Sequence, residues 1–137
     1  MEEINWLSMI LATITPVLLG LAYFHPKALG SAFSSDRKPT KRPNGITIIL
    51  ALVFSFFLAF FMLNFNNSPG QEGDFDNFTH GVWHGMFVGI VIALPITAIN
   101  GIFEGQKLKP LILKTIFWIL TFALTGGILD AMNHWPN

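Results

Sequence analysis

Cysteine is absent from this chain of 137 residues. Without a thiol the protein can form no disulfide, no thiolate metal site and no cysteine nucleophile, and cysteine usage says nothing about its compartment. Charge is also scarce, since charged residues make up 12% of the chain against roughly a quarter in an ordinary soluble domain. Hydrophobic residues make up 52%. The composition therefore predicts a membrane protein with a single domain.

Four long stretches carry no charge or almost none. They cover residues 4–24, 46–65, 82–103 and 111–129. Each has about the 20 residues that a helix needs to cross the hydrocarbon core of a bilayer. Only the fourth holds a charged residue, Lys114, which lies close enough to one end for its ammonium to reach the headgroups. We predict an all-α fold, an integral membrane four-helix bundle built from two helical hairpins.

The basic residues are confined to two segments. All eight lie in the loop 25–45 or between residues 107 and 114, whereas the N-terminus, the loop 66–81 and the C-terminal tail carry only acidic ones. Because lysine and arginine stay in the cytoplasm, we expect the loop 25–45 to be cytoplasmic and the loop 66–81 and both termini to lie outside. The acidic N-terminus also argues against a cleaved signal peptide.

Two prolines fall near the middle of predicted spans, Pro16 in the first and Pro95 in the third. Each removes a backbone donor and should bend its helix. The carbonyl groups that lose their partners would be satisfied by neighbouring helices or by hydroxyl groups such as that of Thr13. We predict a kink at both positions.

Small residues recur at every fourth position of the third and fourth spans. The rows are Gly81, Gly85, Gly89 and Ala93 on the third span, and Ala123, Gly127 and Ala131 on the fourth. No hydrophobic force draws helices together in lipid, so close backbone contact is what such a glycine zipper supplies. We interpret the rows as packing surfaces between helices of the same chain or of a second subunit. A substrate path along the groove is the alternative.

Histidines and a carboxylate are predicted to meet at the outer membrane surface. In an antiparallel hairpin centred near Lys107, His84 lies at the same depth as Asp130. His80 lies at the depth of His134, and the first of these pairs lies about 30 Å from the cytoplasmic end, at the outer membrane surface. Imidazole and carboxylate form a common ligand set, so these four residues are candidate ligands of a divalent transition metal such as zinc or copper. The alternatives are a hydrogen bond between His84 and Asp130 and a proton-responsive contact.

Polar residues are few elsewhere in the spans. Asn100 is expected to bond to a neighbouring helix, and Glu104 to cap its helix or to pair with Lys107 or Lys109. We find no carboxylate within the membrane of the sort that a proton-coupled exporter requires, which weakens a transporter hypothesis. No second acid and no nucleophile accompany the histidines, so we do not expect an enzyme.

The chain resembles the small bacterial membrane proteins grouped as DUF1761, for which no activity is established. The resemblance lies in "NWLSMILATITPVLLGLAYFHPKALGSAF" near the start and in "LPITAINGIFEGQKLKPLILKTIFWILTFALTGGILDAM" in the second half. The chain departs from the family at Phe24-His25-Pro26, where Tyr-Ser-Pro is common, and at Phe33, where Trp is common. The resemblance implies a four-helix protein of the bacterial cytoplasmic (inner) membrane, and it supplies no catalytic residues.

These observations lead to one function hypothesis and one alternative. We expect a non-enzymatic multi-pass membrane protein that packs through small-residue helix faces, as an accessory or assembly subunit or as a homo-oligomer. Its partners would be the lipid bilayer and other membrane protein subunits or further copies of itself, and no nucleic acid. The alternative is a metal-binding or small-solute-handling membrane protein that uses the outer His/Asp cluster. No cofactor is expected apart from the divalent metal of that alternative.

Overall fold

The structure is a computed structural model that describes residues 4–30, 43–66 and 77–133. Within these ranges the chain is all-helical and contains no strand. The elements in chain order are α1 (Trp6–Tyr23), α2 (Gly45–Asn66), α3 (Phe78–Val88), the π-helix η2 (Gly89–Ala93), α4 (Leu94–Phe103) and α5 (Leu108–Met132). Helices α3, η2 and α4 run on as one, so the described part has four helices long and apolar enough to cross a membrane. The predicted all-α membrane fold is confirmed in this respect.

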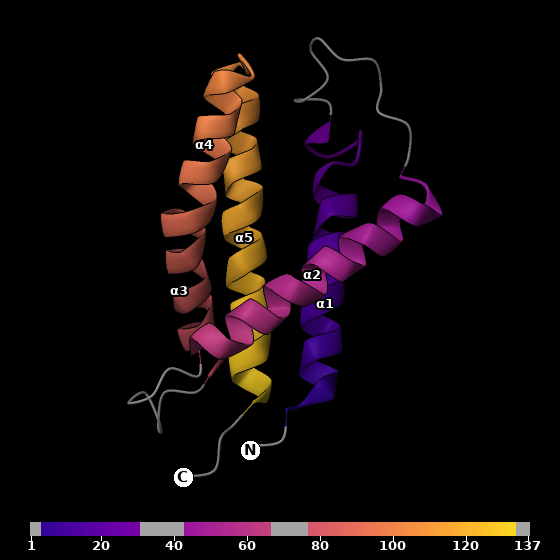
Figure 1. Cartoon of the computed structure of the whole chain (residues 1–137), viewed down its shortest axis with the longest axis vertical. Helices are drawn as coiled ribbons and strands as arrows, with labels where there is room; N and C mark the ends of the chain where they lie inside the picture. Colours follow the sequence, from indigo (N-terminus) through magenta and orange to yellow (C-terminus); the bar gives the residue numbers. More distant parts are fainter. Residues whose placement is uncertain (1–3, 31–42, 67–76, 134–137) are drawn as a thin grey trace.

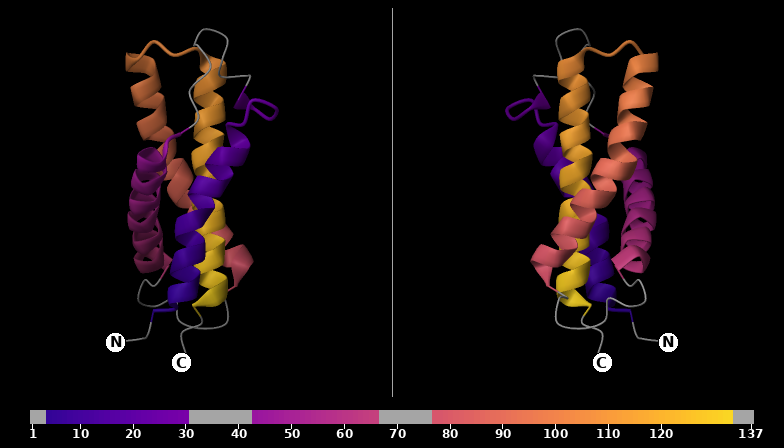
Figure 2. Two further views of the ribbon diagram at one scale, coloured as in Figure 1. Left: turned by 90° about the vertical axis from the view of Figure 1, so that its right-hand side faces the viewer. Right: turned by 90° about the vertical axis from the view of Figure 1, so that its left-hand side faces the viewer.

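Helix α5 lies at the centre of the arrangement. The α3-η2-α4 helix packs along one side of it and α1 along another, while α2 crosses both α1 and α5 obliquely (Figure 1). Seen from the side, the α3-η2-α4 helix also crosses α5 instead of running parallel to it (Figure 2). Each of the other helices therefore contacts α5.

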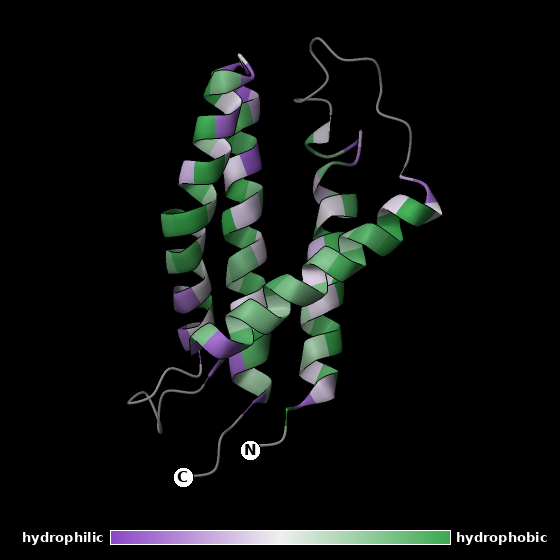
Figure 3. Cartoon of the chain, viewed as in Figure 1, coloured by the Kyte–Doolittle hydropathy of each residue, from purple (hydrophilic) through white to green (hydrophobic). Residues whose placement is uncertain are grey.

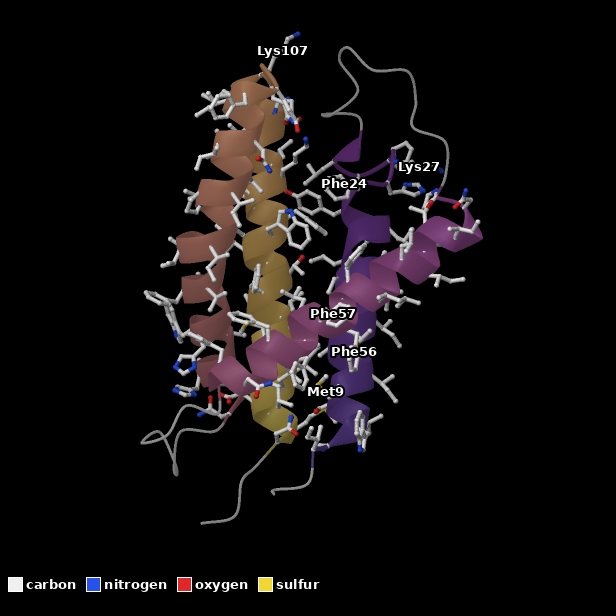
Figure 4. The ribbon with its side chains drawn as sticks, in the orientation of Figure 1. Met9, Phe24, Lys27, Phe56, Phe57 and Lys107 are labelled. Carbon is white, nitrogen blue, oxygen red and sulfur yellow. The ribbon has the colours of Figure 1, made fainter. Side chains whose placement is uncertain are left out.

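The two ends of the bundle differ in what they contain. The first turns of α1 and α3 and the last turns of α2 and α5 lie together at one end, which we name the terminal end (Figure 1). Lys27 and Lys107 lie toward the opposite end, beyond α1 and at the α4–α5 turn, and we name it the basic end (Figure 4). The remaining basic residues of the loop 25–45 lie outside the described residues.

The surface of the bundle is apolar on every helix (Figure 3). Large hydrophobic side chains stand exposed, with exposed fractions of 66% at Phe54, 70% at Ile46 and 71% at Ile102. A soluble protein would bury such side chains, whereas a bilayer solvates them. Four apolar helices with this surface indicate a multi-pass membrane protein.

Two asparagines, one near each end of the chain, join α1 to α5 through hydrogen bonds. Asn5 caps α1, since its side-chain oxygen accepts hydrogen bonds from the backbone N–H groups of Leu7 and Ser8. Its amide nitrogen donates to the Met132 carbonyl at 2.8 Å, and its backbone N–H donates to Asn133 Oδ1 at 3.1 Å. Asn133 in turn donates to Ser8 Oγ at 2.7 Å. The start of the first helix and the end of the last are thus one hydrogen-bonded unit.

The two prolines have different consequences. Pro16 is buried inside α1, and the helix continues through it from Trp6 to Tyr23. The hydroxyl of Thr13, expected to satisfy a released carbonyl, has no hydrogen-bond partner in the described part of the chain. The hydroxyl of Thr15 instead donates to the Leu11 carbonyl at 2.8 Å. Pro95 stands directly after the π-helix η2.

Candidate functional site

The glycines of α3 bring its backbone directly against α5 of the same chain. A Cβ atom on Gly81 would collide with the Gly126 carbonyl, and one on Gly85 with the Phe122 carbonyl. One on Gly89 would lie 2.9 Å from the Ile119 Cα. Backbone atoms cannot move aside as a flexible side chain can, so only glycine fits at these positions. Helix α5 of the same chain therefore occupies the surface that the glycine row of α3 forms.

The row on α5 contributes unequally to this contact. Ala123 is buried beside Gly85, whereas Gly127 receives the side chains of Phe78 and Val82. Ala131 is only half-buried. The α5 glycine that meets the backbone of α3 is Gly126, whose added Cβ would collide with the Gly81 carbonyl, and the spacing of four did not include it. The only sign of Gly126 in the sequence was that it stands beside Gly127 in "TGG".

The π-helix keeps one face of the long helix turned toward α5. Every fourth residue from 81 to 101 is small: Gly81, Gly85, Gly89, Ala93, Thr97 and Gly101. In a regular α-helix such a row drifts by about 40° at each step, or about 200° over its length. Both ends nevertheless face α5, because Gly81 meets Gly126 and Gly101 meets the Leu111 side chain. The π-helix has more residues per turn and rotates the row back.

Pro95 explains why the π-helix lies where it does. Proline has no N–H to give to the preceding turn, so an α-helix must lose a bond at this point. Just before it, the Leu94 N–H donates to the Gly89 carbonyl five residues earlier, which is the hydrogen bond of a π-turn. Thr97 Oγ1 donates to the Ala93 carbonyl at 2.8 Å and also lies 2.9 Å from Thr115 Oγ1 of α5. The kink predicted at Pro95 is thus a local widening of the helix.

A histidine and a carboxylate pair at the terminal end. His80 Nδ1 lies 2.8 Å from Asp130 Oδ2, and the two side chains are 25% and 5% exposed. The sequence had placed His84 opposite Asp130 instead. That expectation assumed two regular helices packed in parallel, whereas the third span contains the π-helix and also crosses α5 (Figure 2). The residue that reaches Asp130 lies one turn earlier.

The side chain of His84 lies between α3 and the last turn of α2. Its ring centroid is 4.1 Å from that of His80, as expected for residues four apart, and 5.9 Å from that of Phe65, which it meets at an interplanar angle of 75°. Its Nδ1 is buried and has no hydrogen-bond partner among the described residues.

Asn66 was not predicted as part of this cluster. It is the last residue of α2, is 8% exposed and donates from Nδ2 to the Gly126 carbonyl at 3.4 Å. Its Oδ1 is buried and, within the described ranges, has no partner. The sequence offered little to find it, since nothing in a single apolar stretch tells which face of α2 turns toward α5.

A metal site of the predicted composition is only partly described. His134 lies outside the described residues. Among residues 4–30, 43–66 and 77–133 there is no group of three or more His, Cys, Asp or Glu side chains that could hold a metal ion. The carboxylate of Asp130 lies against His80, where a carboxylate holds an imidazole in one orientation. The divalent metal stays a prediction.

The other polar residues singled out in the sequence lie toward the basic end. Lys114 Nζ donates to Gln106 Oε1 at 2.8 Å, and Gln106 Nε2 donates to Glu104. Glu104 follows the C-terminus of α4 and is exposed. Asn100 is exposed as well, and no hydrogen bond joins its side chain to another helix in the described part. Glu104, Gln106 and Lys114 form a polar chain at the α4–α5 turn.

Comparison with known proteins finds a family and nothing closer. The sequence model of a family described as "Protein of unknown function (DUF1761)" matches residues 7–130. No curated protein and no solved structure matches the chain.

Proposed function

The chain belongs to the DUF1761 family, and from that premise we propose that it is a non-enzymatic membrane protein that assembles with a further transmembrane helix at α4. The helix would come from a second copy or from another subunit of a membrane complex. The sequence suggested assembly through the glycine row, but α5 occupies that row. A partner must then be received on another surface.

The observation that carries this proposal is how little of α4 is packed. Of its ten residues only Gly101 is buried, whereas α5 buries nine residues between Phe117 and Asp130. Ile96, Ile99 and Ile102 are all more than half exposed. Lipid alone can cover such a surface, so exposure by itself does not distinguish a partner from the bilayer.

The side chain of Asn100 supports a partner at α4. It is an exposed amide in a helix that is otherwise apolar, with no bond to another helix of the described chain. In hydrocarbon an amide gains by bonding to a neighbouring helix, and such residues stabilise transmembrane association. Asn64 of α2 is also exposed but donates to the Phe60 carbonyl of its own helix at 2.7 Å. Asn100 therefore supports docking at α4.

The charge pattern supports a placement in the bacterial inner membrane with the basic end in the cytoplasm. Lys107, Lys109 and Lys114 lie at or near the α4–α5 turn, and Lys27 follows α1. Positive residues are retained on the cytoplasmic side. The N-terminus of α1 and the C-terminus of α5 would then face the periplasm. The docking surface on α4 would lie in the cytoplasmic half of the membrane.

Site-specific photo-crosslinking in native membranes tests the docking surface. Ile102 of α4 and Ile46 of α2 provide a matched pair, because their exposed fractions are 71% and 70%. We expect a photoreactive residue at Ile102 to give a protein adduct and one at Ile46 to give none. Adducts of equal yield at both positions would show that the contacts are random.

A second experiment tests the role of the amide. We expect Asn100→Leu to abolish the adduct and the oligomeric or partner-bound mass seen by native mass spectrometry in nanodiscs. Asn64→Leu, the control with an amide bonded within its own helix, should retain both. A lone monomer from the wild-type chain, or a complex that survives Asn100→Leu, would overturn the proposal.

A further inference from the structure

Two unsatisfied polar atoms lie at the terminal end on different helices. His84 Nδ1 on α3 and Asn66 Oδ1 on α2 are buried and have no hydrogen-bond partner among the described residues. Leaving such an atom unpaired typically costs about 1–3 kcal/mol. The two residues lie where these helices meet, because Phe65, the residue before Asn66, contacts the His84 ring edge-on. A single ligand between them would satisfy both.

The orientation of the Asn66 amide determines what this ligand must supply. The side chain is 8% exposed, and its nitrogen faces the Gly126 carbonyl. A carbonyl oxygen only accepts hydrogen bonds, so the amide nitrogen must stand on that side. Oδ1 is then turned away from Gly126 and is an acceptor without a donor. The neutral ring of His84 can accept at Nδ1 as well.

The charge of the cluster favours a cation. Asp130, 5% exposed, is the only carboxylate that is buried within the described ranges, and it lies against His80. The His80 ring contacts that of His84, with the centroids 4.1 Å apart and the two planes tilted by 52°. A buried carboxylate attracts positive charge strongly because little water screens it. The aromatic ring of Phe65 can add to the binding of a cation.

We infer that His84, Asn66 and Asp130 form a binding site for a small cation that donates N–H hydrogen bonds, either an ammonium ion or the protonated primary amine of a lipid headgroup. Such a group gives a donor to His84 Nδ1 and to Asn66 Oδ1 and carries the charge that Asp130 attracts. A potassium ion has no hydrogen to give to an imidazole. A transition metal would need more ligands than the described histidines and carboxylates bring together.

The structural setting of the site is consistent with either source of the amine. The cluster lies in the first turns of α3 and the last turns of α2 and α5, where a helix spanning the membrane reaches the headgroups. Asp130 stands three residues before Asn133, the residue at the C-terminus of α5. A phosphatidylethanolamine headgroup and free ammonium both present an N–H donor with a positive charge at this depth.

Thermal unfolding of the full chain in phosphatidylcholine nanodiscs tests the site. Ammonium chloride is compared with potassium chloride at equal ionic strength, because the two cations are similar in size and only ammonium donates hydrogen bonds. We expect the midpoint to rise with ammonium and with methylammonium in a saturable manner, and to stay unchanged with potassium or tetramethylammonium. Equal responses to ammonium and potassium would overturn the inference.

Variants show whether the response comes from the cluster. His84→Phe and Asn66→Leu each remove one acceptor, and each should raise the half-saturating ammonium concentration by about tenfold or more. Asn64→Leu, an exposed amide two residues away on the same helix, should respond like the wild type. If Asn66→Leu does not fold, His84→Phe carries the test, with circular dichroism to verify its helices. An unchanged response in His84→Phe would overturn the inference.

Two further arms identify the ligand. Replacing the lipid by phosphatidylethanolamine should abolish the ammonium response if the headgroup already fills the site, and should leave it intact if the ligand is free ammonium. Zinc is titrated in parallel. Stoichiometric zinc bound by the wild type in the absence of any ammonium response would overturn the inference in favour of the metal site predicted from the sequence.

Discussion

The two halves of the α3–α5 hairpin are packed by different means. Toward the terminal end, Gly81 and Gly85 place backbone against backbone, and the contact holds the His80–Asp130 pair. Toward the basic end, Gly101 meets only the flexible side chain of Leu111, and most of α4 is exposed. The same spacing of small residues thus produces a rigid contact in one half and a loose one in the other. What decides between them is whether a glycine faces backbone or side-chain atoms.

Alanine substitutions along the glycine row give the largest expected difference between the halves. Gly85→Ala should lower the free energy of unfolding by about 3 kcal/mol or more, because its Cβ would meet the Phe122 backbone. Gly101→Ala should change it by less than about 1 kcal/mol, since the Leu111 side chain can shift and alanine favours the helix. Denaturant titration in mixed micelles measures both. Gly45→Ala, a position with open space, is the control, and equal losses at Gly85 and Gly101 would contradict the comparison.

The carboxylates of the two ends should differ next most. Asp130→Ala removes the contact between His80 and a buried carboxylate and should destabilise the protein by about 2 kcal/mol. Glu104→Ala at the basic end removes an exposed carboxylate beside Gln106 and should change stability by less than about 0.5 kcal/mol. The same titration resolves this difference. A loss at Glu104 as large as that at Asp130 would show that the basic end is packed as firmly as the terminal end.

The hydroxyl pair of α4 and α5 should give the smallest effect. Thr97→Val removes the contact to Thr115 while keeping the shape of the side chain, and hydrogen bonds between transmembrane helices average about 0.6 kcal/mol. The expected loss is of that size. The double variant Thr97→Val, Thr115→Val should lose no more than either single change, because both remove one contact. Additive losses would mean that the two hydroxyl groups act separately.

The sequence was sufficient to predict the helices but not their rotation. Uninterrupted apolar stretches of this length predict membrane-spanning helices, because a helix satisfies every backbone group within its own segment in lipid. The spacing of Gly81, Gly85 and Gly89 indicated a contact surface, but not that α5 of the same chain would occupy it. Apolar residues on all sides of a span give no sign of which face is inside. Tertiary contacts alone contain that information.

The histidine cluster illustrates how departures from ideal helix packing defeat residue counting. Equal distances from the turn paired His84 with Asp130, but the third span contains a π-helix and crosses α5, and the contact falls on His80, one turn earlier. The proline was visible in the sequence, yet a proline can bend a helix, leave it continuous as at Pro16, or widen it. Asn66 was missed because only the oblique crossing of α2 brings its side chain to Gly126.

The central place of α5 has a consequence for biosynthesis. It leaves the ribosome after the other described helices, and every one of them touches it. Until it is inserted, α1 packs mainly against α2, and the glycines of α3 have no backbone to meet. The native arrangement can therefore form only after translation has reached the end of α5, so a chain that stops before this helix would present quality-control proteases with three unassembled spans.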